Sequence, residues 1–140
     1  MSIQYFKEDV PLPQLKKRKI SNWIKKVIES EGKHFGDISF IFCSDTYLLE
    51  INKKYLKHFY YTDVITFDYV VGNIVSGDVF VSIDRIKENS QIYEVTIESE
   101  LHRVLVHGVL HLLGYIDKDT KSKEMMTFKE DYYLKMQIDN

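Results

Sequence analysis

Cysteine, proline and glycine are scarce in this chain, and long apolar runs are missing. The 140 residues include one cysteine, two prolines and six glycines. A single cysteine, Cys43, excludes an internal disulfide framework and favours a reducing compartment such as the cytoplasm. So few prolines and glycines argue against long flexible linkers. Nowhere do about eighteen apolar residues follow one another, so we expect no membrane-spanning helix and no membrane partner.

An excess of charge of one sign is missing as well. Lysine and arginine total 19 against 21 aspartates and glutamates, which gives a net charge of -2. This balance excludes the uniformly basic surface typical of general nucleic-acid binders. The first ten residues lack a basic stretch followed by an apolar one, so we expect no signal peptide. A hydrophobic content of 44% predicts a globular protein, with residues 1–140 forming one domain.

The spacing of apolar residues predicts an alternation of strands and helices. Helical periodicity covers residues 14–31, 45–55, 94–113 and 120–138, and β-rich segments cover residues 3–6, 37–43, 64–70 and 78–83. Gly72, Asn73 and Gly77 indicate turns between the last two strands. The order of these elements predicts an α+β fold, in which helices pack on a small mixed sheet of about four strands.

The end of the long helix over residues 94–113 carries the most informative motif. His107 and His111 are one helical turn apart and therefore share a face. Gly114 falls where a helix can end in a left-handed residue, and such a turn brings Asp117 back towards the two imidazoles. Three ligands on one side leave coordination positions open, as a catalytic metal requires. The spacing predicts a metallohydrolase site with His107, His111 and Asp117 as ligands.

The donor set indicates which metal this site prefers. Neutral imidazoles with one carboxylate suit Zn²⁺ at neutral pH, one ion per chain, and the oxygen donor broadens tolerance to Mn²⁺ or Fe²⁺. Asp119 is an alternative third ligand that needs a longer return of the loop. The remaining histidines lack partner spacing and are predicted to be surface or packing residues: His34, His58 and His102.

The motif also invites comparison with the metzincin proteases, whose helix begins His-Glu. Here Gly108 follows the first histidine, so the glutamate that acts as general base in those proteases is absent. Glu100, two turns before His107 on the same helical face, is a candidate proton acceptor. A supporting or surface role is the simpler interpretation of Glu100. A metalloprotease is therefore the least favoured hypothesis.

The segment His107-Gly-Val-Leu-His-Leu-Leu-Gly-Tyr115 closely resembles the signature of the YbeY family of bacterial metallo-endoribonucleases. Thr62–Phe67 resembles the family's Thr-Asp-Val-Leu-Ser-Phe segment, and Gly77-Asp78-Val79 resembles its Gly-Asp-Ile strand. The resemblance covers about residues 40–135. It implies a zinc-dependent, single-strand-specific endoribonuclease that acts in ribosomal RNA processing, notably at the 3′ end of 16S rRNA, and in ribosome quality control.

In this chain, three positions depart from the pattern of the family. Asp117 occupies the place of the usual third histidine, Leu56 the place of an arginine proposed to contact phosphate, and Tyr61 the place of a proline. These changes concern the choice of metal and the binding of phosphate rather than the fold. They give weight to a second hypothesis, a ribosome-assembly or interaction protein in which the metal is structural or vestigial.

If the substrate is RNA, basic and aromatic residues are candidates for its path. The aromatic stretch Phe59-Tyr60-Tyr61 and the lysines Lys53, Lys54 and Lys57 are predicted to border a single strand. Arg103, one turn before His107, is a further candidate for substrate binding. The competing interpretation is that the lysines form a solvated helix face and the aromatic residues belong to the core. The expected partners are single-stranded RNA and ribosomal particles.

Overall fold

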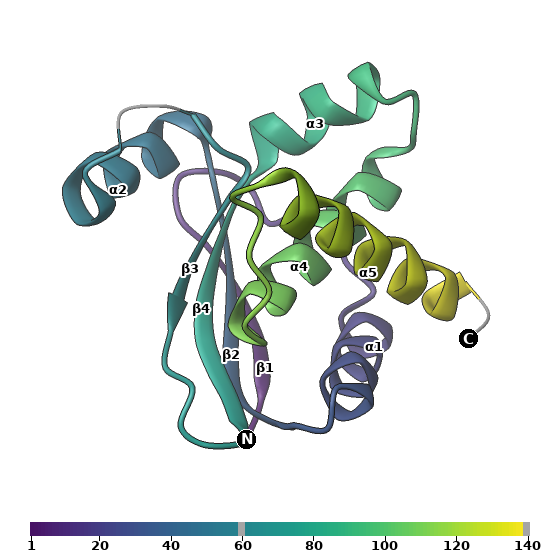
Figure 1. The fold of residues 1–140 in the computed structure, drawn as a ribbon. Coiled ribbons are helices and arrows are strands. Elements are labelled where there is room, and N and C mark those ends of the chain that lie inside the picture. Colours follow the sequence, from purple (N-terminus) through teal and green to yellow (C-terminus); the bar gives the residue numbers. More distant parts are fainter. Residues whose placement is uncertain (59–60, 139–140) are drawn as a thin grey trace.

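The protein is described by a computed structural model, which covers residues 1–58 and 61–138 (Figure 1). Its described strands form one sheet: β1 (Ile3–Lys7), β2 (His34–Cys43), β3 (Val64–Asp68) and β4 (Ile74–Ser82). The spatial order is β1-β2-β4-β3. β2 runs parallel to both β1 and β4, whereas β3 is antiparallel to β4. The predicted α+β fold with a four-stranded mixed sheet is therefore confirmed for the described residues.

The described helices are α1 (Lys17–Ser30), α2 (Asp45–Leu56), α3 (Ile83–Ile92), α4 (Ile97–Leu112) and α5 (Thr120–Ile138). α1 and α4 cover one face of the sheet, where alternate strand residues such as Phe40, Val79 and Val81 are fully buried with them. α2 covers part of the opposite face, over a smaller cluster of Cys43, Leu48 and Ile65. α5 packs on the outside of α4 (Figure 1). The layered arrangement leaves α4 as the central helix of the fold.

The length and polarity of the helices decide whether any of them could cross a membrane. None of the helices formed by residues 1–58 and 61–138 combines the length and apolar character that crossing a membrane requires.

Two expectations about the elements were wrong. The sequence indicated no helix at α3, because only Ile86 and Ser90 are buried there and so few apolar contacts leave almost no periodicity. Its start is marked by Ser82, whose hydroxyl accepts a hydrogen bond from the Arg85 N–H at 3.1 Å. Gly77 is no turn residue but lies inside β4. A Cβ on Gly77 would lie 2.6 Å from the Phe67 carbonyl oxygen and 2.7 Å from Leu112, so glycine permits close packing of β3 and α4.

The position of α4 follows from its cap and from one glycine. The Thr96 hydroxyl accepts a hydrogen bond from the Ser99 N–H at 3.0 Å, and Glu98 and Glu100 in the first turn complement the helix dipole. At Gly108 the helix backbone rests directly on β4, because a Cβ there would lie 2.6 Å from Val79 Cγ1. A glutamate at this position would clash with the strand. The packing thus explains why the protease-type base is missing.

Candidate metal centre

The C-terminal half of α4 carries the two histidines of the motif. Gly108 faces the sheet, and His107 and His111 lie on another side of the helix, both partly buried. Their rings meet edge to face, with centroids 4.5 Å apart. The one-turn spacing therefore places both imidazoles at one point on the helix surface, as predicted.

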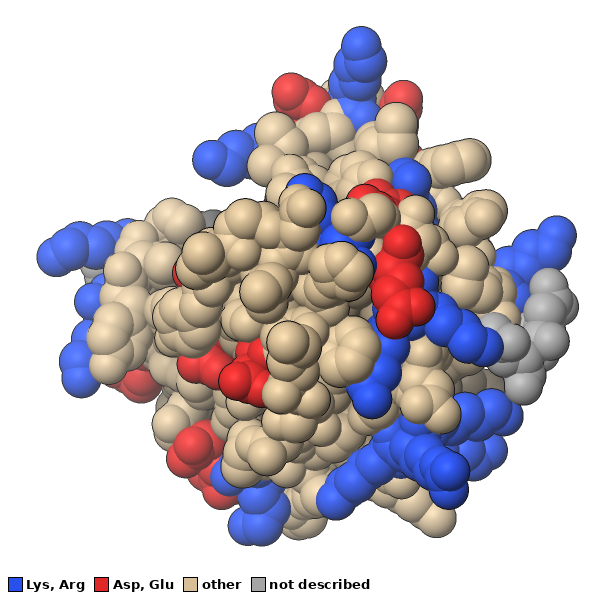
Figure 2. All heavy atoms as spheres, turned by 90° about the horizontal axis from the view of Figure 1, so that it is seen from below, with Lys and Arg blue, Asp and Glu red and all other residues tan. Residues whose placement is uncertain are grey.

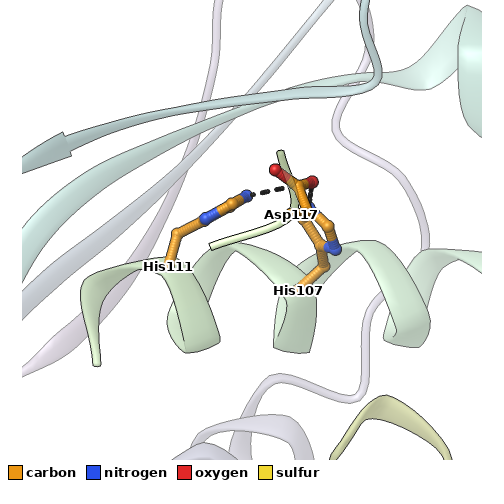
Figure 3. Close-up of side chains that lie close together, drawn as sticks. All are labelled: His107, His111 and Asp117. Atoms are coloured by element: carbon orange, nitrogen blue, oxygen red, sulfur yellow. Dashed lines mark ion pairs between the residues drawn. The ribbon is translucent and has the colours of Figure 1, made fainter. Parts of the chain in front are cut away.

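A tight turn then brings the third residue back over the helix. Gly114 adopts a left-handed conformation with φ of +103°, and the Tyr115 N–H donates to the Leu110 carbonyl oxygen at 3.0 Å. Asp117 Oδ2 lies 3.4 Å from His107 Nε2 and 3.6 Å from His111 Nε2. Figure 3 shows the carboxylate facing both rings.

These distances fit a shared metal ion. Ligand atoms bound tetrahedrally at about 2.0–2.1 Å from zinc are separated from one another by roughly 3.4 Å. One ligand atom from each of His107, His111 and Asp117 lies within 4.8 Å of the other two. No other such group of three metal-ligating side chains occurs among residues 1–58 and 61–138. All three ligands approach from one side, so coordination positions remain for water or substrate.

The other ring nitrogen of each histidine is occupied by the protein. His107 Nδ1 lies 2.7 Å from Glu130 Oε2, and His111 Nδ1 lies 3.0 Å from the Tyr115 carbonyl oxygen. Both partners are acceptors, so each Nδ1 carries the proton and each Nε2 presents a lone pair towards Asp117. Carboxylate and carbonyl partners of this kind commonly fix the orientation of metal-binding histidines. Both rings are therefore held ready for a cation.

Glu130 is itself held by an arginine. Arg103 Nη1 donates to Glu130 Oε1 at 2.7 Å and Nη2 donates to Asp131 at 3.1 Å, while Nε lies 4.0 Å from Glu100. Glu130 is only 7% exposed. A buried carboxylate needs such partners, because it would otherwise be strongly destabilised. Arg103 therefore holds Glu130 in place against His107, and its predicted contact with substrate stays a prediction.

The protein environment pulls the pKa values of the site in different directions. Burial alone would lower the pKa of His107, but the hydrogen bond and the charge of Glu130 raise it above the usual value. Burial and the neighbouring His107 lower the pKa of His111. Burial also raises the pKa of Asp63 and of Glu100. Perturbed groups gathered in this way are typical of functional sites.

The other acid and histidine candidates lie apart from the ligand group. Asp119 caps α5, where its Oδ1 accepts from the Ser122 N–H at 2.7 Å. His102 points to the opposite side of α4 and packs on Trp23, with ring centroids 5.8 Å apart. Glu100 is buried beside Arg103 and not at the ligand group, so its role as proton acceptor stays a prediction.

The lysines predicted to contact RNA are exposed at the C-terminal end of α2. Lys53 pairs weakly with Glu50 at 3.6 Å, and Lys54 lies over the ring of Tyr55. Figure 2 shows basic side chains projecting on the left, the side on which Figure 1 places α2. Phe59 and Tyr60 of the aromatic stretch lie outside the described residues, and Tyr61 is 57% exposed.

Comparison with known proteins agrees with this arrangement. Residues 4–137 match the family model described as Endoribonuclease YbeY. The chain belongs to this family. A family member from Parabacteroides distasonis is 50% identical over 134 residues, covering 96% of this chain and 94% of that protein. Another from Bacteroides thetaiotaomicron is 47% identical over 136 residues, covering 97% and 99%. Both are named endoribonucleases of the YbeY family.

Comparison with solved structures supports the fold. A solution structure of a Thermotoga maritima protein superposes with a TM-score of 0.65 at 23% identity, covering 97% of this chain and 89% of that one. The family model and the two relatives confirm the resemblance predicted from the histidine motif at the level of the YbeY family. The sequence did not indicate a role for two residues of the site: Glu130, which is 23 positions from His107, and Asp63. Neither has a local spacing signal.

Proposed function

We propose that this YbeY family member is a zinc-dependent, single-strand-specific endoribonuclease that matures ribosomal RNA, notably the 3′ end of 16S rRNA, and serves ribosome quality control. The observation that carries the proposal is the one-sided group of His107, His111 and Asp117, with ligand atoms within 4.8 Å of one another. The donor set, two imidazoles and a carboxylate, fits Zn²⁺. Family membership supports RNA as the substrate.

The residues of such a site have different roles. A bound divalent ion would supply Lewis acidity at the scissile phosphate and would acidify water. Glu130 and the Tyr115 carbonyl orient the two imidazoles, and Arg103 holds Glu130 in place. The carboxylate of Asp117 leaves a smaller net positive charge at the site than a third histidine would, so we infer milder acidification of water than at a site of three histidines.

Replacement of Asp117 by alanine is expected to reduce bound zinc from about one ion per chain to a small fraction, because one of three ligands is lost. Zinc in the purified protein is measured by mass spectrometry. Asp119→Ala is the matched control, since Asp119 caps α5 and its loss is expected to lower stability only slightly, with zinc retained. Full zinc content in Asp117→Ala, with loss in Asp119→Ala, would reverse the assignment of the third ligand.

The α2 lysines are expected to contact the RNA backbone. Each phosphate neutralised on a single strand contributes about -0.7 to the slope of log affinity against log salt concentration. Changing Lys53, Lys54 and Lys57 together to glutamine should therefore flatten this slope by up to about 2. Binding is measured by fluorescence anisotropy at several salt concentrations. Changing Lys16, Lys17 and Lys19 to glutamine removes the same charge from the cap and first turn of α1. A slope altered by the α1 change alone would place the RNA on α1 instead.

A further inference from the structure

A cleft of about 530 Å³ opens beside the metal ligands, towards the N-terminal end of α4. It shares His107 with the metal centre and runs to Glu100, which lies seven residues earlier and thus about 10 Å along the helix axis. Its volume lies in the range of small-molecule sites, about 300–1,000 Å³. α3, the turn that follows it and α5 form the other walls through Asn89, Tyr93 and Thr127. The cleft therefore adjoins the place where the cut bond would lie.

The lining of this cleft is acidic. Asp63, Glu100, Glu130 and Asp131 face a single cation, Arg103. Arg103 already pairs with Glu130 and Asp131, at 2.7 and 3.1 Å. Such a lining repels a phosphate group and favours a neutral group rich in hydrogen-bond donors. The acids of the cleft also form no group of three ligands for a second metal ion within the described part of the chain.

An aromatic ring stands at the edge of the same cleft. Tyr93 is 62% exposed although it lies in an ordered turn between α3 and α4. The Tyr93 N–H donates to the Asn89 carbonyl oxygen at 2.9 Å, and the Val95 N–H donates to the Ser90 carbonyl oxygen at 3.0 Å. A large ring kept at the surface by a fixed backbone is a suitable platform for stacking a nucleobase.

We propose that the cleft binds the base of a nucleotide next to the cut bond. In this arrangement the base stacks on Tyr93, and its exocyclic amino group donates to Asp63 and to the side-chain oxygen of Asn89. Carboxylates and amide oxygens accept from the amino groups of cytosine and adenine, whereas uracil has no amino group to offer. The site therefore prefers amino-bearing bases to uracil. This specificity rests on the proposed ribonuclease function.

Nucleoside titrations test the cleft without any cleavage. Cytidine, adenosine and uridine are added to the zinc-loaded protein, and the amide resonances of Asn89 and Tyr93 are followed by NMR. We expect cytidine and adenosine to bind with a Kd about tenfold below that of uridine. Tyr93→Ala should raise these Kd values about tenfold, and Tyr93→Phe should restore them. Tyr132→Ala is the control, because Tyr132 is 54% exposed but lies outside the cleft.

Cleavage of uridine oligomers that contain one cytidine or adenosine provides the second measurement. We expect cuts next to the inserted nucleotide to exceed cuts between uridines about tenfold, and Tyr93→Ala to remove this preference. Equal binding of uridine, or unchanged binding and site preference in Tyr93→Ala, would overturn the proposal. Absence of cleavage in wild type would overturn the proposed function instead, and the nucleoside titrations would still decide whether the cleft binds bases.

Discussion

Replacement of His111 by alanine is expected to abolish RNA cleavage and to weaken zinc binding by well over 100-fold, while the fold is kept. A residue that merely supports a ligand costs about 10–100-fold in metal affinity, so losing a ligand should cost more. The imidazole is only partly buried and lies outside the main core cluster, so its removal leaves no large cavity. Cleavage of a single-stranded oligoribonucleotide, zinc content and circular dichroism together check this result.

A second histidine of the same helix provides the control. His102→Ala removes an imidazole from the opposite side of α4, where it packs on Trp23, and should leave cleavage and zinc content unchanged. The experiment also separates the two leading hypotheses. An endoribonuclease loses cleavage in His111→Ala but still binds ribosomal particles. Binding of ribosomal particles without any cleavage, in wild type as in His111→Ala, would favour the assembly-protein hypothesis. Cleavage that persists after zinc is lost would show that the metal is not catalytic.

Glu130→Gln is expected to lower zinc affinity about 10–100-fold without removing any ligand. The carboxylate makes two contacts at 2.7 Å, to His107 Nδ1 and to Arg103 Nη1. An amide offers one oxygen for these two donors and turns an N–H group towards the other, so His107 loses part of its orientation and basicity. Zinc affinity is measured by competition with a chromophoric chelator.

Asp131→Asn is the matched comparison for Glu130. Asp131 contacts the same guanidinium at 3.1 Å, but its side chain is 61% exposed and makes no contact with a ligand histidine. Zinc affinity should change less than about threefold in this variant, since exposed ion pairs contribute little. Equal losses in both variants would mean that Arg103, rather than the contact to His107, determines metal affinity. Wild-type affinity in Glu130→Gln would show that its role is confined to packing.

Local spacing was enough to predict that His107, His111 and Asp117 meet as a group that could hold a metal ion. His107 and His111 share a helix face, and Gly114 permits the turn that returns Asp117, so the whole group depends on contacts within eleven residues. The strands and the long helices were predictable for the same reason, because burial imposes a period on their apolar residues. The boundaries of β2 and β4 were less accurate, since both strands begin earlier than their apolar alternation indicates.

Features that depend on packing between distant segments were not predictable in this way. Glu130 reaches His107 only because α5 lies along α4, and no sequence period records that approach. Glycine is typical of turns, but Gly77 lies in a strand, where the packing of Leu112 leaves no room for a side chain. Asp63 and Tyr93 come from separate loops and meet at one cleft only after the sheet and α4 have formed.

The contact between Glu130 and His107 links the docking of α5 to the binding of a metal ion at the candidate centre. α5 is also tied to α1, where Trp23 Nε1 donates to the Tyr133 carbonyl oxygen at 2.8 Å and Glu31 accepts from the Tyr133 hydroxyl. By thermodynamic reciprocity, an ion that binds more tightly when α5 is docked must stabilise that docking by the same free energy. A metal ion at this centre and the docked C-terminal helix would thus stabilise each other, and loosening the helix would weaken the binding of the ion.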